Sequence, residues 1–232
     1  MSLAAPAPAA PVCPALPLRF EALGRRQVVA DFSGGQLSTD GGALLLRAVD
    51  RGLGLTARLA QAFTDGRAAR DCDHSLAHLL TQRLYGCALG YADLNDHDTL
   101  RHDPLLAVAC DKLDPLGNDR LHAHAHGVAL AGSATLNRLE LGHQPTDRYH
   151  KIHYDPNAVA ATLLELGVRC LNQHAAELVI DLDAMGHLVH GRQAGRHFNP
   201  YYDGYCLLPL YAFVGSVPLW AGVASGRRRR RL

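Results

Sequence analysis

Two aspartates spaced two positions apart are the pair in this chain best suited to bind a metal. They end the run Glu-Leu-Val-Ile-Asp-Leu-Asp-Ala at residues 177–184, whose aliphatic side chains predict a buried strand. Residues two apart on a strand point to the same face, so Asp181 and Asp183 are expected to project together. Two such charges repel unless a cation or a proton lies between them, and oxygen ligands suit Mg²⁺. The alternative is a strand end whose acids are solvated or cap the next turn.

A second candidate site is the segment 148–154, in which basic and aromatic residues are interspersed (Arg-Tyr-His-Lys-Ile-His-Tyr). Cationic side chains neutralise phosphates and aromatic rings stack on bases, so this composition suits contacts with a nucleic acid backbone. The alternative is an ordinary solvated linker.

Three further polar groups resemble metal ligands in composition. They are the alternating histidines His122, His124 and His126, the acid- and histidine-rich segment 93–98, and the histidines His187 and His190. We interpret the first as a surface segment and the second as helix caps and turn residues. The third would serve a metal hydrolase together with Asp181 and Asp183, a rival hypothesis that loss of metal binding in Asp183→Asn would support.

The composition indicates a soluble globular protein. Of the 232 residues, 48% are hydrophobic and 19% are charged, which is too apolar for a disordered chain. Six cysteines without a CxxC pair favour reduced thiols and a cytoplasmic location. No run is long enough for a membrane span. Residues 1–25, rich in alanine and proline at their start, are expected to form a disordered leader, and the arginine-rich residues 227–232 a tail.

Periodicity and capping signals predict helices first and strands second, an α+β fold. Helices are expected at 43–50 (buried), 55–63, 73–91, 105–110, from 133, and at 156–174, and strands at 26–32, 177–184, 205–215 and from 218. The Asp155-Pro156 dipeptide fits a cap followed by proline at the first helical position, and Asp203-Gly204 is a hairpin signal. Residues 26–154 would then form a mostly helical region and residues 155–226 the start of a sheet-containing core.

Many short motifs, in order over residues 28–223, resemble bacterial insertion-sequence transposases of the DDE type, in the branch of DDE domain group 1. The motifs are Asp-Phe-Ser-Gly-Gly (31–35), Leu-Ser-Thr-Asp-Gly-Gly-Ala-Leu-Leu-Leu-Arg (37–47), Arg-Leu-Tyr-Gly (83–86), Gly-Tyr (90–91), Asp-Leu-Asn-Asp-His-Asp (93–98), Ser133 with Thr-Leu-Asn-Arg-Leu-Glu (135–140), Arg-Tyr-His-Lys-Ile (148–152), Asp-Leu-Asp-Ala (181–184), His-Gly (190–191), Gly-Arg (195–196), Tyr-Tyr (201–202), Gly-Tyr-Cys (204–206) and Leu-Pro-Leu-Tyr (208–211).

The resemblance implies a helical N-terminal part that binds double-stranded transposon ends, followed by a ribonuclease-H-like α/β core. In that core two Asp and one Glu hold two Mg²⁺ or Mn²⁺ ions for phosphodiester cleavage and strand transfer. By resemblance the first acid is Asp183, with Asp181 as second choice, and a homo-oligomer is the expected assembly. DNA contacts are assigned to residues within the matched motifs: Arg138, Arg148, Tyr149, His150 and Lys151.

Two departures from the family pattern lead to an expectation of truncation. Met185 and Gly186 follow Ala184 where the family has threonine and an acid, and the sequence after Tyr211 holds neither the second Asp nor the Glu. We therefore expect an incomplete catalytic core that does not transfer strands by itself. The alternatives are a non-catalytic fragment that binds DNA ends or dimerises and competes with the intact transposase, and a fragment that does not fold stably.

Overall fold

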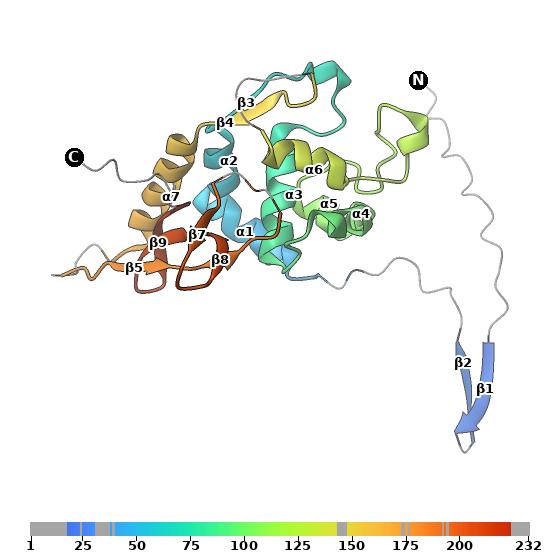
Figure 1. Cartoon of the computed structure of the whole chain (residues 1–232). Coiled ribbons are helices and arrows are strands. Elements are labelled where there is room, and N and C mark those ends of the chain that lie inside the picture. The colour runs from blue at the N-terminus through green and yellow to red at the C-terminus, as the bar shows by residue number, and fades with distance from the viewer. Residues whose placement is uncertain are drawn as a thin grey trace, which may run out of the picture. The chain divides into compact units, whose positions relative to one another are not determined.

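The computed structural model describes residues 18–23, 25–30, 38, 40–142, 148–172, 175, 177–191, 193 and 195–223. The chain divides into two compact units, residues 1–39 and 40–232. The described residues form seven α-helices and several small antiparallel sheets, which makes the protein a mixed α+β fold as predicted (Figure 1). Residues 1–17 of the expected leader 1–25, and the expected tail 227–232, lie outside the described residues.

The first unit contains a two-stranded hairpin formed by β1 (Leu18–Leu23) and β2 (Arg26–Ala30). The strands are antiparallel, with Phe20 opposite Val28. Strand β2 was predicted, whereas β1 falls inside the expected leader 1–25. The expectation of a leader ending at residue 25 therefore needs correction, because Leu-Arg-Phe-Glu alternates apolar and charged residues in the manner of a strand.

The second unit begins with a group of helices and two short strands. The elements in chain order are α1 (Ala43–Leu53), α2 (Leu55–Ala60), β3 (Phe63–Asp65), η1 (Ala69–Asp71), α3 (Leu76–Ala88), η2 (Leu94–Asp96), α4 (His97–Leu100), α5 (Pro104–Ala109), η3 (Ala123–Ala125), α6 (Ser133–Glu140) and β4 (Ile152–Tyr154). Two clusters of buried side chains hold them together, one around Leu106 and Leu130 and the other around Leu79 and Leu136. The predicted helices are present, although Ser75 and not Asp73 caps α3. Helix α1 leaves Leu45 and Val49 exposed, so its predicted burial is wrong on one face.

A buried polar pair fixes α3 against α4. The side-chain amide of Gln82 donates to the Ala131 carbonyl at 2.8 Å and accepts from the Ala131 amide at 3.0 Å, and its nitrogen lies 3.1 Å from His97 Nδ1. Gly86 permits the close approach, since a Cβ there would lie 2.7 Å from His97 Cε1. Burial, followed by the charge of Arg83, lowers the pKa of His97. The acid-rich segment that includes His97 therefore serves packing and capping.

The remaining elements are one helix and the strands of two small sheets. They are α7 (Pro156–Cys170), β5 (Asp181–Ala184), β6 (His187–Leu188), β7 (His197–Asn199), β8 (Gly204–Leu207), β9 (Pro209–Val214) and β10 (Val217–Val223). One sheet has the order β10-β9-β5 and the other β6-β8-β7, all antiparallel. The cap at Asp155 is confirmed, because its carboxylate accepts from the Asn157 amide at 2.9 Å. The chain also turns at residues 200–203, so β7 and β8 form the predicted hairpin.

Helix α7 packs on β10 at a close contact. A Cβ on Gly167 would lie 2.5 Å from the carbonyl oxygen of Pro218 and 2.9 Å from Leu219 Cδ2, so only glycine allows the two backbones to approach this closely. The predicted single strand 205–215 is divided at Pro209, which has no amide hydrogen for a continuous ladder, and its halves join different sheets. Within the described ranges, none of the helices combines the length and apolarity needed to cross a bilayer.

Candidate nucleic-acid interface

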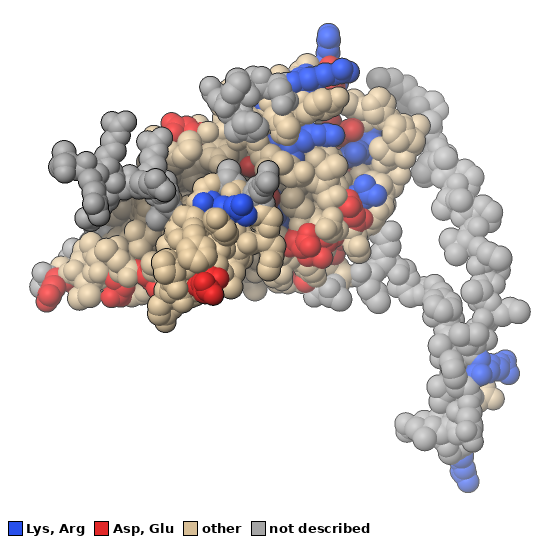
Figure 2. Space-filling model, in the orientation of Figure 1, with Lys and Arg blue, Asp and Glu red and all other residues tan. Residues whose placement is uncertain are grey.

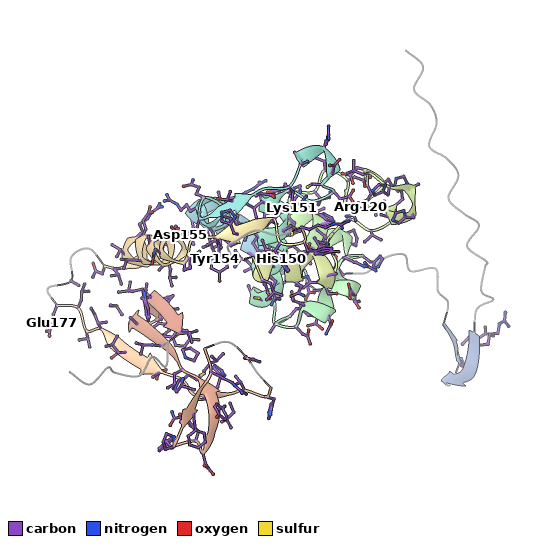
Figure 3. The ribbon with its side chains drawn as sticks, turned by 45° about the horizontal axis from the view of Figure 1, so that its top comes forward. Arg120, His150, Lys151, Tyr154, Asp155 and Glu177 are labelled. Carbon is purple, nitrogen blue, oxygen red and sulfur yellow. The ribbon has the colours of Figure 1, made fainter. Side chains whose placement is uncertain are left out.

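Strand pairing brings together two basic segments that are distant in the sequence. Strands β3 and β4 are antiparallel, with Asp65 opposite Ile152. Just beyond this pair, the Gly66 amide donates to the Lys151 carbonyl at 2.8 Å. Arg67 and Lys151 therefore lie at the same end of the ladder. Figure 3 shows Lys151 and His150 where β4 begins, and Tyr154 and Asp155 where it leads into α7.

A cleft opens beside this ladder. It has a volume of about 300 Å³ and is lined by residues in and around η1, by one residue of α6 and by the segment before β4: Arg67, Ala68, Asp71, Cys72, Arg138, Arg148, Tyr149 and Lys151. We call it the basic cleft. Figure 2 shows lysine and arginine side chains gathered along the edge of the molecule where η1, β3 and α6 lie in Figure 1.

The cations of the basic cleft differ in their pairing. Arg67 donates two hydrogen bonds to the Asp65 carboxylate, from Nε to Oδ1 at 2.9 Å and from Nη2 to Oδ2 at 2.7 Å. This pairing raises the pKa of Arg67 and lowers that of Asp65. Within the described part of the chain, Arg138, Arg148 and Lys151 form no ion pair. These three exposed cations are therefore available to an external anion.

An aromatic ring adds a flat surface to the basic cleft. The Tyr149 side chain is 65% exposed, and the Arg148 guanidinium carbon lies 5.7 Å from its ring centroid. A guanidinium next to an exposed ring can bind a phosphate while the ring contacts a sugar or a base. The arrangement suits a nucleic acid backbone better than a small anion, because its contacts spread over a wide, open surface.

Four of the five residues predicted to contact DNA line the basic cleft: Arg138, Arg148, Tyr149 and Lys151. The fifth, His150, is half-buried and does not line it. Arg67 was missed in the sequence, because only the pairing of β3 with β4 places it near Lys151. The spacing of these residues along the chain contains no signal that predicts this pairing.

The two candidate metal ligands lie elsewhere, on edge strand β5. Asp181 pairs with Phe213 and Asp183 with Tyr211, so both acids share one face of the sheet with these rings. The predicted burial of this strand is wrong, since all four residues of β5 and the preceding Leu178, Val179 and Ile180 are exposed. Strand β5 has only β9 as a neighbour among the described strands, and an apolar composition cannot specify a second one.

The two aspartates are the right kind of ligand for a divalent cation, but two ligands are too few to hold one in a catalytic site. Two carboxylates on one face are the hard oxygen donors that Mg²⁺ and Mn²⁺ prefer. In the described residues, however, no three His, Cys, Asp or Glu side chains gather into a metal-binding group. His187 pairs with Leu207 in the other sheet, and the hydrolase set of Asp181, Asp183, His187 and His190 is therefore not assembled.

The other polar segments have structural roles. The Asp93 carboxylate accepts from the Asn95 amide at 2.9 Å, and Asp98 accepts from the Ser133 amide at 3.0 Å and its hydroxyl at 2.7 Å. His122 and His124 stack on each other with ring centroids 5.5 Å apart, on an exposed segment. These observations agree with the interpretation of both segments as capping and surface residues.

A basic, aromatic-lined cleft on a helical region and an acid pair on a following strand are features of the class of DNA-processing proteins. The chain matches the family model described as Transposase DDE domain group 1 over residues 20–230. This match covers most of the sequence, so the chain belongs to that transposase family, whose members act on DNA and typically use divalent metal ions. Searches of curated proteins and of solved structures return no match.

Proposed function

We propose that this chain is an insertion-sequence transposase polypeptide whose helical region binds double-stranded transposon ends through the basic cleft. The observation that carries the proposal is the convergence of Arg138, Arg148 and Lys151, without ion pairs among the described residues, around the exposed ring of Tyr149. Arginines bind phosphate oxygens in pairs of parallel hydrogen bonds, and their charge attracts the duplex at long range.

Salt dependence of duplex binding tests this role. We expect a double variant, Arg148→Ala with Lys151→Ala, to weaken binding of a labelled 30-base-pair duplex. Each phosphate contact adds about −0.9 to the slope of log K against log salt, so losing two should make the slope less negative by about 2. Arg169→Ala is the matched control, since Arg169 is an exposed arginine at the end of α7, away from the basic cleft. An equal loss in the control, or an unchanged slope in the double variant, would contradict the proposal.

Residues 155–226 are proposed as the start of the ribonuclease-H-like core, with Asp183 as its first acid and Asp181 beside it. The support is their position on β5, the first strand of the sheet β10-β9-β5. Asp183 and Asp181 would hold a divalent cation, which when bound supplies an activated water or hydroxyl for attack on a phosphodiester. The chain's own contribution is to hold two carboxylates on one exposed face.

A second candidate function is DNA-end binding without cleavage by this polypeptide, in competition with intact transposase. It is favoured by the absence, among the described residues, of a third acidic or histidine ligand near the pair. We expect this chain alone not to nick supercoiled plasmid in MgCl₂ or MnCl₂, while it still retards linear duplex. Nicking that disappears in Asp183→Asn would overturn this expectation and assign catalysis to the chain itself. A homo-oligomer stays a prediction.

A further inference from the structure

Helix α6 presents a narrow polar ridge to solvent. Its buried side holds Leu136 and Leu139, which pack in the core with Leu79. Its outer side exposes Ala134, Asn137 and Arg138, spaced three and four apart and therefore on one face. The side-chain amide of Asn137 makes no hydrogen bond to any residue that the structure describes, so both its donor and its acceptor are available.

The two flanks of this ridge differ in charge. On one flank Arg138 lines the basic cleft with Arg148 and Lys151. On the other, Asn137 and Ala134 line a second hollow of about 320 Å³, together with Asp93, Leu94, Asn95 and Ser133. Phosphates are attracted to the first flank and repelled by the Asp93 carboxylate on the second. A duplex on this surface would thus place a backbone strand on the cleft side and its base edges over the ridge.

The amino end of α6 is not the phosphate contact. Asp98 already accepts hydrogen bonds from the amide and the hydroxyl of Ser133 there, at 3.0 and 2.7 Å. Its negative charge offsets the positive end of the helix dipole and occupies the donors that an anion would use. Phosphate is therefore attracted to the side of α6 and not to its amino end. We expect the helix axis to run along the groove for this reason.

Building on the proposed DNA binding, we propose that α6 lies in the major groove and reads an A·T base pair with Asn137 and Ala134. An α-helix with its side chains is about 10–12 Å across, which fits the width of the major groove, about 12 Å. An asparagine amide pairs with N6 and N7 of adenine through one donor and one acceptor, and an alanine methyl contacts the methyl group of thymine. Arg138, Arg148 and Lys151 hold the adjacent phosphates and set the register.

A selection from duplexes with a randomised central segment tests this assignment. We expect the wild-type chain to select a motif that contains a fixed A·T pair, and Asn137→Ala to lose the preference at that pair by about tenfold while it keeps the preferences elsewhere. Affinity for random duplex and its salt slope should stay unchanged in Asn137→Ala, because no phosphate contact is removed. Asn157→Ala, an identical change at an exposed residue of α7, is the matched control and should select the wild-type motif.

The outcomes separate this inference from the function on which it rests. A wild-type chain that binds no duplex overturns the proposed DNA binding. A wild-type chain that binds duplexes and selects no motif, or an Asn137→Ala variant that selects the wild-type motif, overturns the role of α6 and leaves DNA binding by the basic cleft intact. A circular dichroism melt of each variant confirms that it is folded before its selection is compared.

Discussion

The helical region and the C-terminal sheets of the second unit differ in how completely they cover their apolar residues. Both continuous core clusters lie between residues 43 and 152, and their largest side chains, such as Leu79, Leu106 and Leu136, are almost fully buried. In the sheets, Cys206, Ala212 and Leu219 are buried, whereas Leu178, Val179, Ile180 and Leu182 on and before β5 are all more than half exposed. The basic cleft is therefore built on a packed framework, and the acid pair on an edge strand that few neighbours restrain.

The difference teaches that the two functions of a transposase polypeptide place separate demands on the fold. In the proposed binding of a duplex, the cations come from α6 and from the segment that leads into β4, next to the second core cluster. Holding a cation requires carboxylates from several elements, which must approach each other. Strand β5 provides two of them at a sheet edge, where β9 is its single neighbour among the described strands.

The largest expected effect is on the free energy of unfolding when a matched leucine is truncated in each region. Leu79→Ala removes a fully buried side chain of α3 and should lower it by about 2–5 kcal/mol. Leu182→Ala removes a side chain that is 70% exposed and should change it by less than about 0.5 kcal/mol. Guanidinium denaturation followed by circular dichroism measures both. A loss in Leu182→Ala as large as in Leu79→Ala would show that β5 is covered in solution and would remove the contrast.

The same contrast explains which parts of the fold could be predicted from the sequence. Local signals succeeded: the Asp155-Pro156 cap begins α7, and Asp203-Gly204 ends the turn between β7 and β8. The burial of residues 177–184 was predicted wrongly, because aliphatic residues indicate a strand without indicating what packs on it. Burial is a property of neighbours, and a single sequence carries no information about their positions.

An effect of intermediate size is the pH dependence of the unfolding free energy, which a buried histidine of the helical region should produce. Burial, followed by the charges of Arg120 and Lys112, lowers the pKa of His74 to about 3. The unfolded chain binds a proton at this histidine near pH 6.5 and the folded chain does not, so stability is fully present above pH 6.5 and falls as the pH drops toward the folded pKa. Between pH 6.5 and 5 the loss should be about 2 kcal/mol, at about 1.4 kcal/mol per pH unit.

The variant His74→Gln isolates this contribution from those of other histidines. We expect the difference in unfolding free energy between pH 7.5 and pH 5 to be smaller by about 2 kcal/mol than in the wild type, whatever the stability of the variant at pH 7.5. Burial also lowers the pKa of His97 and of His78, so a residual dependence of the same sign should remain. An equal dependence in both proteins would mean that His74 is accessible to protons and that this part of the core is open.

The candidate sites were predictable to different extents for a related reason. Arg148, Tyr149 and Lys151 fall within four consecutive residues, so their composition alone indicated a shared surface, and the structure places them in one cleft. Arg67 joins them only through the β3–β4 ladder, and Asn137 stands out only once the buried face of α6 is known. Neighbouring residues can be grouped from the sequence, whereas residues grouped by tertiary pairing require the structure.

The smallest expected effect is that of Asp183→Asn on folding. The side chain is exposed on β5, with the like charge of Asp181 two residues away on the same face. Removing one charge should therefore change the unfolding free energy by less than about 0.5 kcal/mol, with a slight gain from reduced repulsion. Denaturation in low salt, where repulsion is least screened, measures it, and Asp181→Asn should behave alike. A loss above about 1 kcal/mol would mean that Asp183 makes a folding contact and is a structural residue. A neutral result would instead leave its carboxylate free for a ligand, because a charged pair that adds nothing to stability is held together by the strand geometry alone.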